Sequence, residues 1–178
     1  MNLILVNDQD FISTDTVVLH GRRFEHILQV HRAEVTQTLK VGLINGNSGH
    51  GKISAINDQS VTLVVSFYQA PLSPLPLTLI LALPRPKMLK RILQTTAALG
   101  VKDIYLINSY KVDKSYWSSP VLSPASITEH LHLGLEQAVD TIMPRIHLKK
   151  RFKPFVEDEL LTIADNSLKL VAHPYNAH

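Results

Sequence analysis

The sequence predicts an α/β protein in which a small β-barrel, residues 1–70, precedes a parallel-sheet α/β domain, residues 77–178. Three observations support this division. Short alternating apolar runs fill the first part, a proline-rich linker covers residues 71–76, and apolar strands alternate with helical spacing beyond it. Strand–helix–strand repetition of this kind is typical of a parallel sheet with right-handed crossovers.

The first 70 residues contain five short apolar runs of the kind that form strands. These runs are Leu3–Val6, Val17–Leu19, Leu39–Ile44, Gly51–Ile56 and Val61–Phe67. Turn-forming residues separate them, and the glycines at positions 46, 49 and 51 fit a hairpin. We expect antiparallel strands that close into a compact barrel or sandwich.

One segment of this half, residues 21–30, has helical rather than strand spacing. Phe24, Ile27 and Leu28 form its apolar stripe. Arg22 and His26 lie four residues apart and therefore share a helix face, where they could contact RNA phosphates or a flipped base. An exposed cationic helix edge explains the same residues equally well.

The segment over residues 70–76 carries three prolines in six residues. Proline removes backbone donors and disfavours a continued helix or central strand, so this segment is predicted to be a linker.

Beyond the linker, strands and helices are predicted to alternate. The residues of Leu77–Leu83 are almost all apolar, as in a strand buried on both faces. The remaining strands are predicted at Asp103–Asn108, Arg145–Lys149 and Leu168–His173. The predicted helices have apolar stripes at Leu89, Ile92, Leu93, Thr96 and Leu99 before Gly100, at Ile127, Leu131, Leu135 and Ala138 after Ser123-Pro124, and at about Val156–Ala164. Ligands bind at the carboxyl ends of such strands, so the chain ends about where a ligand site would be completed.

The charge is uneven along the chain. The net charge is +3, but residues 1–70 carry five basic and six acidic side chains, whereas residues 71–178 carry thirteen and nine. Two basic clusters dominate the second part: Arg85, Lys87, Lys90 and Arg91, then Arg145, Lys149, Lys150, Arg151 and Lys153. Such clusters attract nucleic acid, although a solvated surface face is the commoner explanation.

Composition excludes several functional classes. The chain has no cysteine, which excludes disulfides and thiolate metal sites and suits the cytoplasm. Apolar runs are too short for a membrane span. The nine histidines lack the spacing of a zinc site, so no metal is expected. Neither a glycine-rich phosphate loop nor a nucleophile elbow occurs, and the catalytic residue is not assigned.

Two further features could act in binding. Glu136 and Gln137, near the end of the second long helix, could hydrogen-bond a substrate, but an exposed helical pair is commoner. Trp117 lies beside lysine in a loop, which suits base stacking, although packing over the sheet is at least as probable on composition alone.

Several segments together resemble the bacterial 16S ribosomal RNA uracil-N(3)-methyltransferase family of the SPOUT superfamily. The run over residues 21–32 is similar to the family's "H-hydrophobic-x-V-x-R" helix, and residues 81–88 to the start of its catalytic domain. Further matches follow in the family's order, at Leu99-Gly100-Val101, Asn108-Ser109, Trp117, Glu136-Gln137, Met143-Pro144 and residues 170–174. The chain departs from the family at Ala98, where the family often has glutamate, and at Asp140, where it often has arginine shortly after Glu-Gln.

The resemblance implies a PUA-like barrel, a SPOUT-type methyltransferase domain with a C-terminal knot, and a homodimer built around that knot. It also implies S-adenosylmethionine as methyl donor and a uridine N3 in 16S ribosomal RNA, free or in the small subunit, as acceptor. The RNA contacts are predicted at Arg22, Arg23, His26, Arg32, Arg85 and Lys87.

The donor site is predicted to be incomplete in these 178 residues. Of the three donor loops of the family, only the first has a counterpart here, at Val171, Ala172, His173 and Pro174. The other two contain Gly-Pro-Glu-Gly-Gly and Leu-Gly-x-x-Ile-Leu-Arg motifs, which do not occur in this sequence. Two other functions stay open: a non-catalytic RNA-binding protein that lost its cofactor site, and a small-molecule-binding α/β protein.

Overall fold

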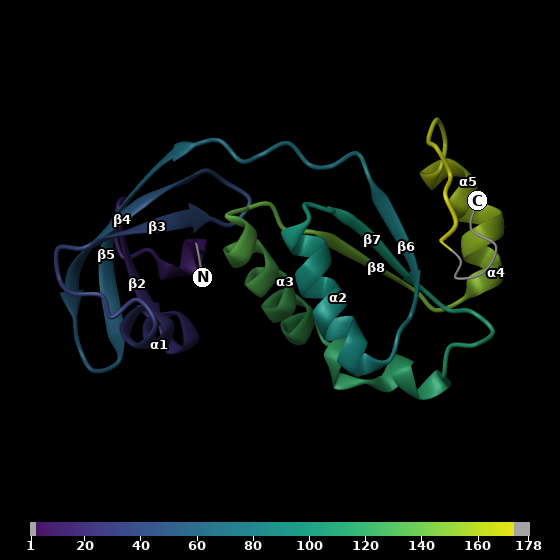
Figure 1. Cartoon of the computed structure of the whole chain (residues 1–178), viewed down its shortest axis with the longest axis horizontal. Helices are drawn as coiled ribbons and strands as arrows, with labels where there is room; N and C mark the ends of the chain where they lie inside the picture. Colours follow the sequence, from purple (N-terminus) through teal and green to yellow (C-terminus); the bar gives the residue numbers. More distant parts are fainter. Residues whose placement is uncertain (1–2, 173–178) are drawn as a thin grey trace.

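The computed structural model describes residues 3–172 and shows an elongated molecule with two sheets (Figure 1). The N-terminal sheet lies at one end, the second sheet and its two long helices occupy the middle, and a short helical segment lies at the other end. Residues 70–77 form neither helix nor strand and run in an extended path from one sheet to the other.

The first sheet has five strands in the order β1-β3-β4-β5-β2. Their bounds are β1 (Ile4–Val6), β2 (Thr16–His20), β3 (Thr38–Leu43), β4 (Ser48–Ile56) and β5 (Ser60–Gln69). All five predicted strands are confirmed, but β1 pairs with β3 in parallel, so the expectation of purely antiparallel pairing is wrong. The connection from β1 to β3 contains β2 and a helix, which is long enough to return the chain to the same end of the sheet.

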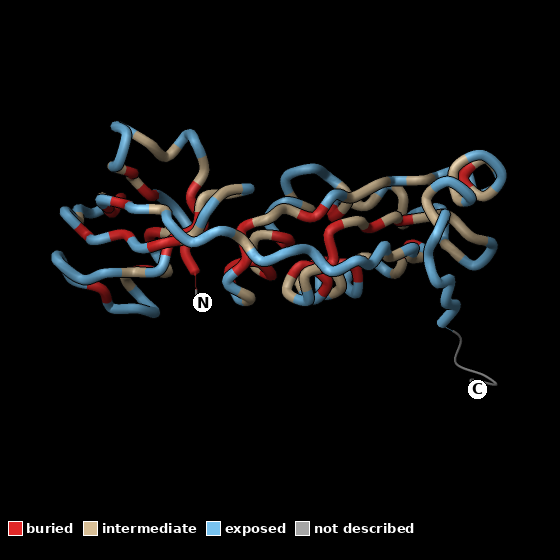
Figure 2. The backbone as a smooth tube through the Cα atoms, turned by 90° about the horizontal axis from the view of Figure 1, so that it is seen from above, coloured by how far each residue is buried: buried red, intermediate tan, exposed pale blue. Residues whose placement is uncertain are grey.

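The first sheet curls around its own apolar core. Buried and exposed residues alternate along its strands (Figure 2), as expected of a sheet with one solvated face. The core includes Val17, Val41 and Leu63, all fully buried. The predicted closure into a full barrel is not seen in the described residues: β1 and β2 are the two edge strands and do not pair, so the sheet is a half-barrel, called the barrel below. Helix α1 (Gly21–Gln29) packs Phe24 and Ile27 against its core, and a 3-10 turn, η1 (Asp8–Asp10), precedes β2.

The predicted hairpin between β3 and β4 is confirmed, and one of its glycines permits a close approach of two strands. A Cβ atom on Gly49 would lie 1.9 Å from the carbonyl oxygen of Ser66 on β5. Glycine is needed here because only its missing side chain leaves room for that backbone.

The second sheet is parallel, as predicted, with the order β6-β7-β8. Its strands are β6 (Thr78–Ala82), β7 (Asp103–Ile107) and β8 (Arg145–Lys149). Helices α2 (Pro86–Ala98) and α3 (Pro124–Ala138) pack side by side on one face of the sheet (Figure 1). The other face is left partly open, so β6 is not buried on both faces as expected: Ile80 is 37% exposed.

Both long helices have the end signals that their sequences predict. Pro86 and Pro124 stand in the first turns, and Gly100 follows α2 with a φ of 80°. Leu99 does not belong to the buried stripe of α2, because it is the capping residue beyond the last turn, and it is 63% exposed. A Cβ atom on Gly134 would lie 2.3 Å from the carbonyl oxygen of Gln94, so glycine lets α2 and α3 approach closely.

The chain beyond β8 differs most from the sequence prediction. The helical segment starts earlier than residue 156: it consists of α4 (Phe152–Pro154), a π-helical turn (Phe155–Glu159) and α5 (Leu160–Ile163). Phe155, which is 1% exposed, packs against Tyr105 on the open face of the sheet.

The predicted strand Leu168–His173 is not formed over its described residues, 168–172. An extended apolar segment becomes a strand only where a sheet edge accepts its hydrogen bonds, and this segment is exposed instead of paired: Leu168 and Leu170 are 85% and 82% exposed. His173 lies outside the described residues. Within residues 3–172, no helix has the length and apolar character to cross a membrane.

Candidate functional site

The carboxyl edge of the parallel sheet is where the fold class predicts a ligand site. Two backbone hydrogen bonds continue the sheet past its strands, from Leu83 N to Ile107 O at 2.9 Å and from Asn108 N to Lys149 O at 3.0 Å. The sequence after each strand therefore meets at this edge: the start of α2, the loop from Asn108, and Lys149 to Arg151.

Trp117 fixes the loop that follows β7. It lies on a 3-10 helix, η2 (Lys114–Ser118), which a second one, η3 (Pro120–Leu122), follows. Its indole Nε1 donates a hydrogen bond to Oδ1 of Asn108 at 3.2 Å, and the ring packs against the apolar core of this half. The ammonium of Lys150 lies 5.9 Å from the ring centroid, within the range of a cation–π interaction. The packing role considered for Trp117 is therefore present, and Trp117 joins two segments of the edge.

The residues of the two basic clusters have different surroundings in the folded protein. Arg85 and Lys87 are exposed at the N-terminus of α2, where backbone N–H groups already favour anions, and neither forms an ion pair with any residue from 3 to 172. Lys150 and Arg151 are also exposed near this edge. In contrast, Arg145 lies at the amino end of β8, 2.7 Å from Asp103.

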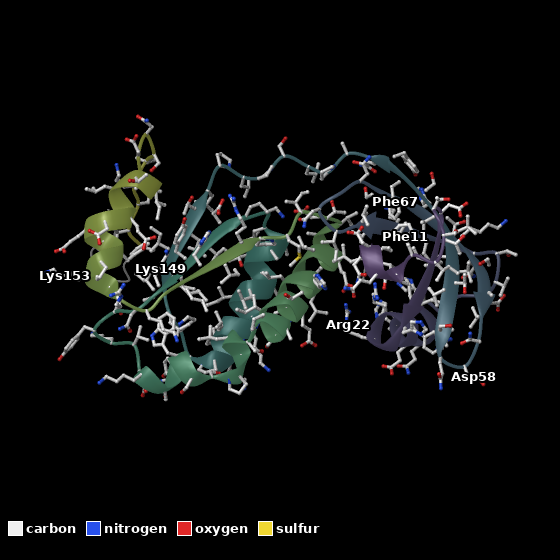
Figure 3. All side chains as sticks on the ribbon, turned by 180° about the vertical axis from the view of Figure 1, so that it is seen from behind. Phe11, Arg22, Asp58, Phe67, Lys149 and Lys153 are labelled. Carbon is white, nitrogen blue, oxygen red and sulfur yellow. The ribbon has the colours of Figure 1, made fainter. Side chains whose placement is uncertain are left out.

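Two other lysines of the second cluster have carboxylate partners. Lys149 pairs with Glu159 at 2.5 Å, and Lys153 lies 3.8 Å from Glu157. Figure 3 labels both lysines beside the C-terminal helical segment. The Lys149–Glu159 pair joins that segment to the end of β8, whereas Lys153 and Glu157 pair within the segment. Arg85, Lys87, Lys150 and Arg151 remain exposed near the edge.

A second concave site lies between the barrel and α3. It is a cleft of about 300 Å³, and most of the residues that line it have polar side chains. Its charged and imidazole side chains are His20, Arg22, Arg23, Glu129, His132 and Glu136. Figure 3 shows Arg22 at this junction, on the side of the barrel that faces α3.

An ion pair crosses this cleft. Arg22 donates from Nη1 to Oε2 of Glu136 at 3.0 Å and from Nη2 to Oε1 at 2.7 Å. Glu136 is 1% exposed, so it is not the exposed helical residue that the sequence suggested. The hydrogen bonds to Glu136 raise the pKa of Arg22. A bidentate pair of this kind adds geometric specificity as well as interaction energy. It therefore holds the two halves of the molecule together.

Hydrogen bonds from the β3–β4 turn reinforce the same junction. Asn45 N donates to the carbonyl of Thr141 at 2.8 Å, and Met143 N donates to Oδ1 of Asn45 at 2.9 Å. The hydroxyl of Thr141 donates to the carbonyl of Gly46 at 2.6 Å. Backbone groups of both halves are therefore satisfied by one another rather than by water.

The predicted RNA residues of α1 are not gathered with Arg85 and Lys87, because the barrel and the carboxyl edge lie at opposite ends of the molecule (Figure 1). Arg23 is held within the barrel by Asp10, with Nη2 to Oδ1 at 2.7 Å, and by the carbonyl of Leu5 at 2.9 Å. Arg32 is exposed.

The imidazole of His26 is partly buried. Its ring lies 5.1 Å from that of His31, and its Nε2 is buried without a hydrogen-bond partner in the described structure. Burial lowers the pKa of His26, as does the neighbouring His31. Neutral His26 is therefore favoured in the folded protein.

The predicted donor loop is not assembled around a ligand-sized space in this structure. Val171 is 91% exposed, and Ala172 is also exposed. His173 and Pro174 lie outside the described residues. Among residues 3–172, no group of three or more His, Cys, Asp or Glu side chains could hold a metal ion.

Sequence reasoning missed two features of the molecule. Glu129 and His132 line the cleft together with Glu136, which the sequence had singled out; the three follow one another at helical spacing on α3, and that spacing could have identified the other two. Lys102 and Asp140 form a buried ion pair at 2.5 Å, and Lys102 also donates to the carbonyl of Ile142 at 2.6 Å. Their separation in sequence gives no local signal for that contact.

Comparison with known proteins identifies the family of this fold. The family model described as an RNA methyltransferase domain matches residues 71–178. The chain belongs to this RNA methyltransferase family. The resemblance inferred from the ordered motifs is therefore confirmed at family level.

Named relatives agree with the family assignment. The chain is 28% identical over 169 residues to ribosomal RNA small subunit methyltransferase E of Treponema pallidum, covering 94% of this chain and 64% of that protein. It is 25% identical over 154 residues to ribosomal RNA small subunit methyltransferase E 1 of Borreliella burgdorferi, covering 86% and 63%. The chain thus spans slightly less than two thirds of the length of these relatives.

A solved structure shares the fold. The S-adenosylmethionine-bound ribosomal RNA small subunit methyltransferase E of Neisseria gonorrhoeae superposes with a TM-score of 0.64 at 17% identity, covering 85% of this chain and 62% of that one. At this identity the likeness shows the arrangement of the barrel-like sheet and the parallel sheet.

Proposed function

We propose that this chain is part of an enzyme that transfers a methyl group from S-adenosylmethionine to N3 of a uridine in 16S ribosomal RNA. The observation that carries the proposal is the family match over residues 71–178, which contain the whole parallel sheet. The names of the Treponema and Borreliella relatives supply the substrate class, and the ligand of the Neisseria structure supplies the donor.

In this proposal the barrel is PUA-like and handles RNA, and the second half belongs to a SPOUT-type domain. The whole enzyme acts in the cytoplasm as a homodimer. Exposed apolar side chains support a missing partner surface, since Leu168, Leu170 and Val171 are all more than four-fifths exposed.

The carboxyl edge supports RNA contact near the reaction. Arg85 and Lys87 offer cations beside backbone donors at the start of α2, a combination that binds phosphate groups. Methylation of N3 requires an unpaired or flipped uridine, because pairing hides that nitrogen. The edge residues would then hold the RNA backbone while the base is oriented.

The barrel contributes Arg22, Arg23, His26 and Arg32 to the proposed RNA surface. For Arg22 and Arg23 a phosphate would have to share the guanidinium with Glu136 or Asp10. We therefore assign these two arginines a structural role first, and expect the direct contact of this region to come from the exposed Arg32, which follows α1.

The described residues do not fit a bound donor on their own. A cofactor loop wraps its ligand, whereas Val171 and Leu170 are 91% and 82% exposed. No reaction step is therefore derived through S-adenosylmethionine, and we expect this 178-residue chain to bind it weakly. Titration calorimetry tests this expectation, and nanomolar binding would refute it.

Gene deletion tests the enzyme as it exists in its own organism. Removing the gene that encodes this chain should abolish one 3-methyluridine of 16S ribosomal RNA, measured by mass spectrometry of nuclease digests. Unchanged 3-methyluridine would overturn the proposed reaction.

The exposed donor segment also favours a second candidate, a non-catalytic RNA-binding protein. The two candidates predict different outcomes for the deletion. RNA binding by the purified chain together with an unaltered 16S modification pattern would select the second candidate.

A further inference from the structure

The outer face of the barrel sheet gathers cations and aromatic rings that no part of the methyltransferase site uses. We call this surface the outer strand face and define it by Lys40, His50, Lys52, Ser66 and Tyr68. All five residues are exposed. Strand pairing places Lys40, His50 and Ser66 in one row across β3, β4 and β5. Lys52 follows His50 by two positions along β4, and Tyr68 follows Ser66 by two positions along β5. Because these strands are antiparallel, Lys52 and Tyr68 lie on opposite sides of this row, on the same face of the sheet.

Two rings on this face form an exposed aromatic platform. The rings of His50 and Tyr68 are stacked, with centroids 5.7 Å apart and planes at 25°, and the Tyr68 hydroxyl is hydrogen-bonded to Nδ1 of His50. Tyr68 is 60% exposed although it is a large aromatic residue. The hydrogen bond holds the rings in place, so a further flat group can stack on them without ordering the side chains first.

Basic and acidic residues of the barrel lie in different elements of its structure. Its five strands contain no aspartate or glutamate, and they contain Lys40 and Lys52. The six acidic residues of the first half all lie elsewhere, in η1, α1 and the loops: Asp8, Asp10, Asp15, Glu25, Glu34 and Asp58. The charged side chains that the strands contribute to the outer strand face are therefore all cationic, and cations attract anions.

We propose that the outer strand face binds single-stranded RNA, with bases stacked on Tyr68 and His50 and phosphates held by Lys40 and Lys52. The proposal rests on the proposed function, since it names a surface that would hold substrate RNA far from the reacting base. Stacking rings favour single strands because the bases of a duplex already stack on one another. This assignment replaces α1 as the main RNA surface of the barrel, because the α1 arginines are engaged by Glu136 and Asp10.

Fluorescence anisotropy of the whole chain with a fluorescein-labelled, mixed-sequence single-stranded RNA of about 12 nucleotides tests the surface. Tyr68→Ala should weaken binding about tenfold, the size expected for one lost base stack, whereas Tyr68→Phe should stay within about twofold. Both variants should keep the wild-type thermal midpoint, since the side chain is largely exposed. Unchanged binding by Tyr68→Ala, or equal binding of a duplex of the same sequence, would overturn the proposal.

The lysines are tested through salt dependence. Lys40→Gln with Lys52→Gln should lower the slope of log affinity against log salt by about 1.4, the value for two phosphates of a single strand. The matched control is Arg145→Gln with Lys169→Gln, which removes the same charge from exposed positions outside the barrel and away from the carboxyl edge and should leave the slope nearly unchanged. An equal drop in both double variants would mean general charge attraction and would overturn the surface.

Gene deletion separates failure of the surface from failure of the reaction. If deletion removes 3-methyluridine but the Tyr68 and lysine variants bind RNA normally, the reaction stands and the surface is wrong. If deletion changes nothing while Tyr68→Ala loses RNA binding, the surface stands and the proposed reaction is wrong.

Discussion

The two sheets of this protein bury their faces in different ways. The barrel sheet curls around a core of its own, so that Val17, Val41 and Leu63 are fully buried by other strands and α1. The parallel sheet instead buries one face against helices, and α2 and α3 both cover that face. Its other face is covered in part by Phe155 and leaves Ile80 exposed.

This difference shows that similar apolar strands acquire their burial from their neighbours. β6 is richer in apolar residues than β4, yet β4 alternates between buried and exposed positions while β6 has no fully buried residue. A strand at a sheet edge with one covered face cannot bury both rows of side chains. The four predictions below test this contrast and the junction between the two halves.

The largest effect is expected in the barrel core. Leu63→Ala should lower the free energy of unfolding by about 3 kcal/mol, because it removes a fully buried side chain and leaves a cavity. Ile80→Ala, on the open face of the other sheet, should cost less than about 1 kcal/mol. Urea unfolding of both variants measures the contrast, and equal costs would contradict it.

A smaller effect is expected where β4 and β5 approach closely. Gly49→Ala should destabilise the barrel by about 2 kcal/mol, since the new methyl group would collide with the backbone carbonyl of Ser66. Gly51→Ala is the matched control on the same strand, because its methyl group would meet mainly movable side chains of Val41 and Val65. Thermal unfolding should rank Gly49→Ala well below Gly51→Ala, and the reverse order would refute the close approach.

Loss of the ion pair between the two halves should lower the free energy of unfolding about as much as Gly49→Ala, or slightly less. Arg22→Met leaves the buried carboxylate of Glu136 without its partner, and we expect a loss of about 1–2 kcal/mol, reduced from the value for a fully buried pair because Arg22 is 39% exposed. Arg145→Met removes an ion pair whose arginine is 73% exposed and should cost at most about 0.5 kcal/mol. A double-mutant cycle with Glu136→Gln should show coupling between Arg22 and Glu136. Additive effects of the two substitutions would exclude a stabilising interaction between them.

The smallest effect is a pH dependence of the junction. Burial lowers the pKa of His132 below its ordinary value of 6.5. The unfolded chain then binds the proton more readily than the folded one, so stability falls as the pH drops below about 6.5 and is unaffected well above it.

Unfolding free energies at pH 5 and pH 7.5 test this sign. His132→Asn should reduce the difference between the two values, and His26→Asn should do the same in part, because burial also lowers the pKa of His26. The charged and imidazole groups that share the cleft with His132 are His20, Arg22, Arg23, Glu129 and Glu136. An unchanged pH difference in His132→Asn would show that these neighbours, not His132, set the dependence.

Much of the candidate site could be predicted from the sequence, and the predictions that failed have a common cause. Arg85 and Lys87 were predicted from the basic cluster over residues 85–91 and from the resemblance of residues 81–88 to the family, both of which are local signals. Glu136 was not recognised as buried, because its partner Arg22 lies 114 residues away in sequence. The same distance hid the structural use of Arg22, which the local sequence presents only as a free cation on a helix.

The sequence by itself determined the two-part architecture, the five barrel strands, the parallel order of the second sheet and the family. These follow from hydrophobic period, proline and glycine positions and ordered motifs, all of which act within a few residues. Only the tertiary structure decided which charges pair at the junction, which side chains of the barrel strands share one exposed face and which face of β6 meets solvent. Those outcomes depend on pairing between segments distant in the chain, which local periodicity does not specify.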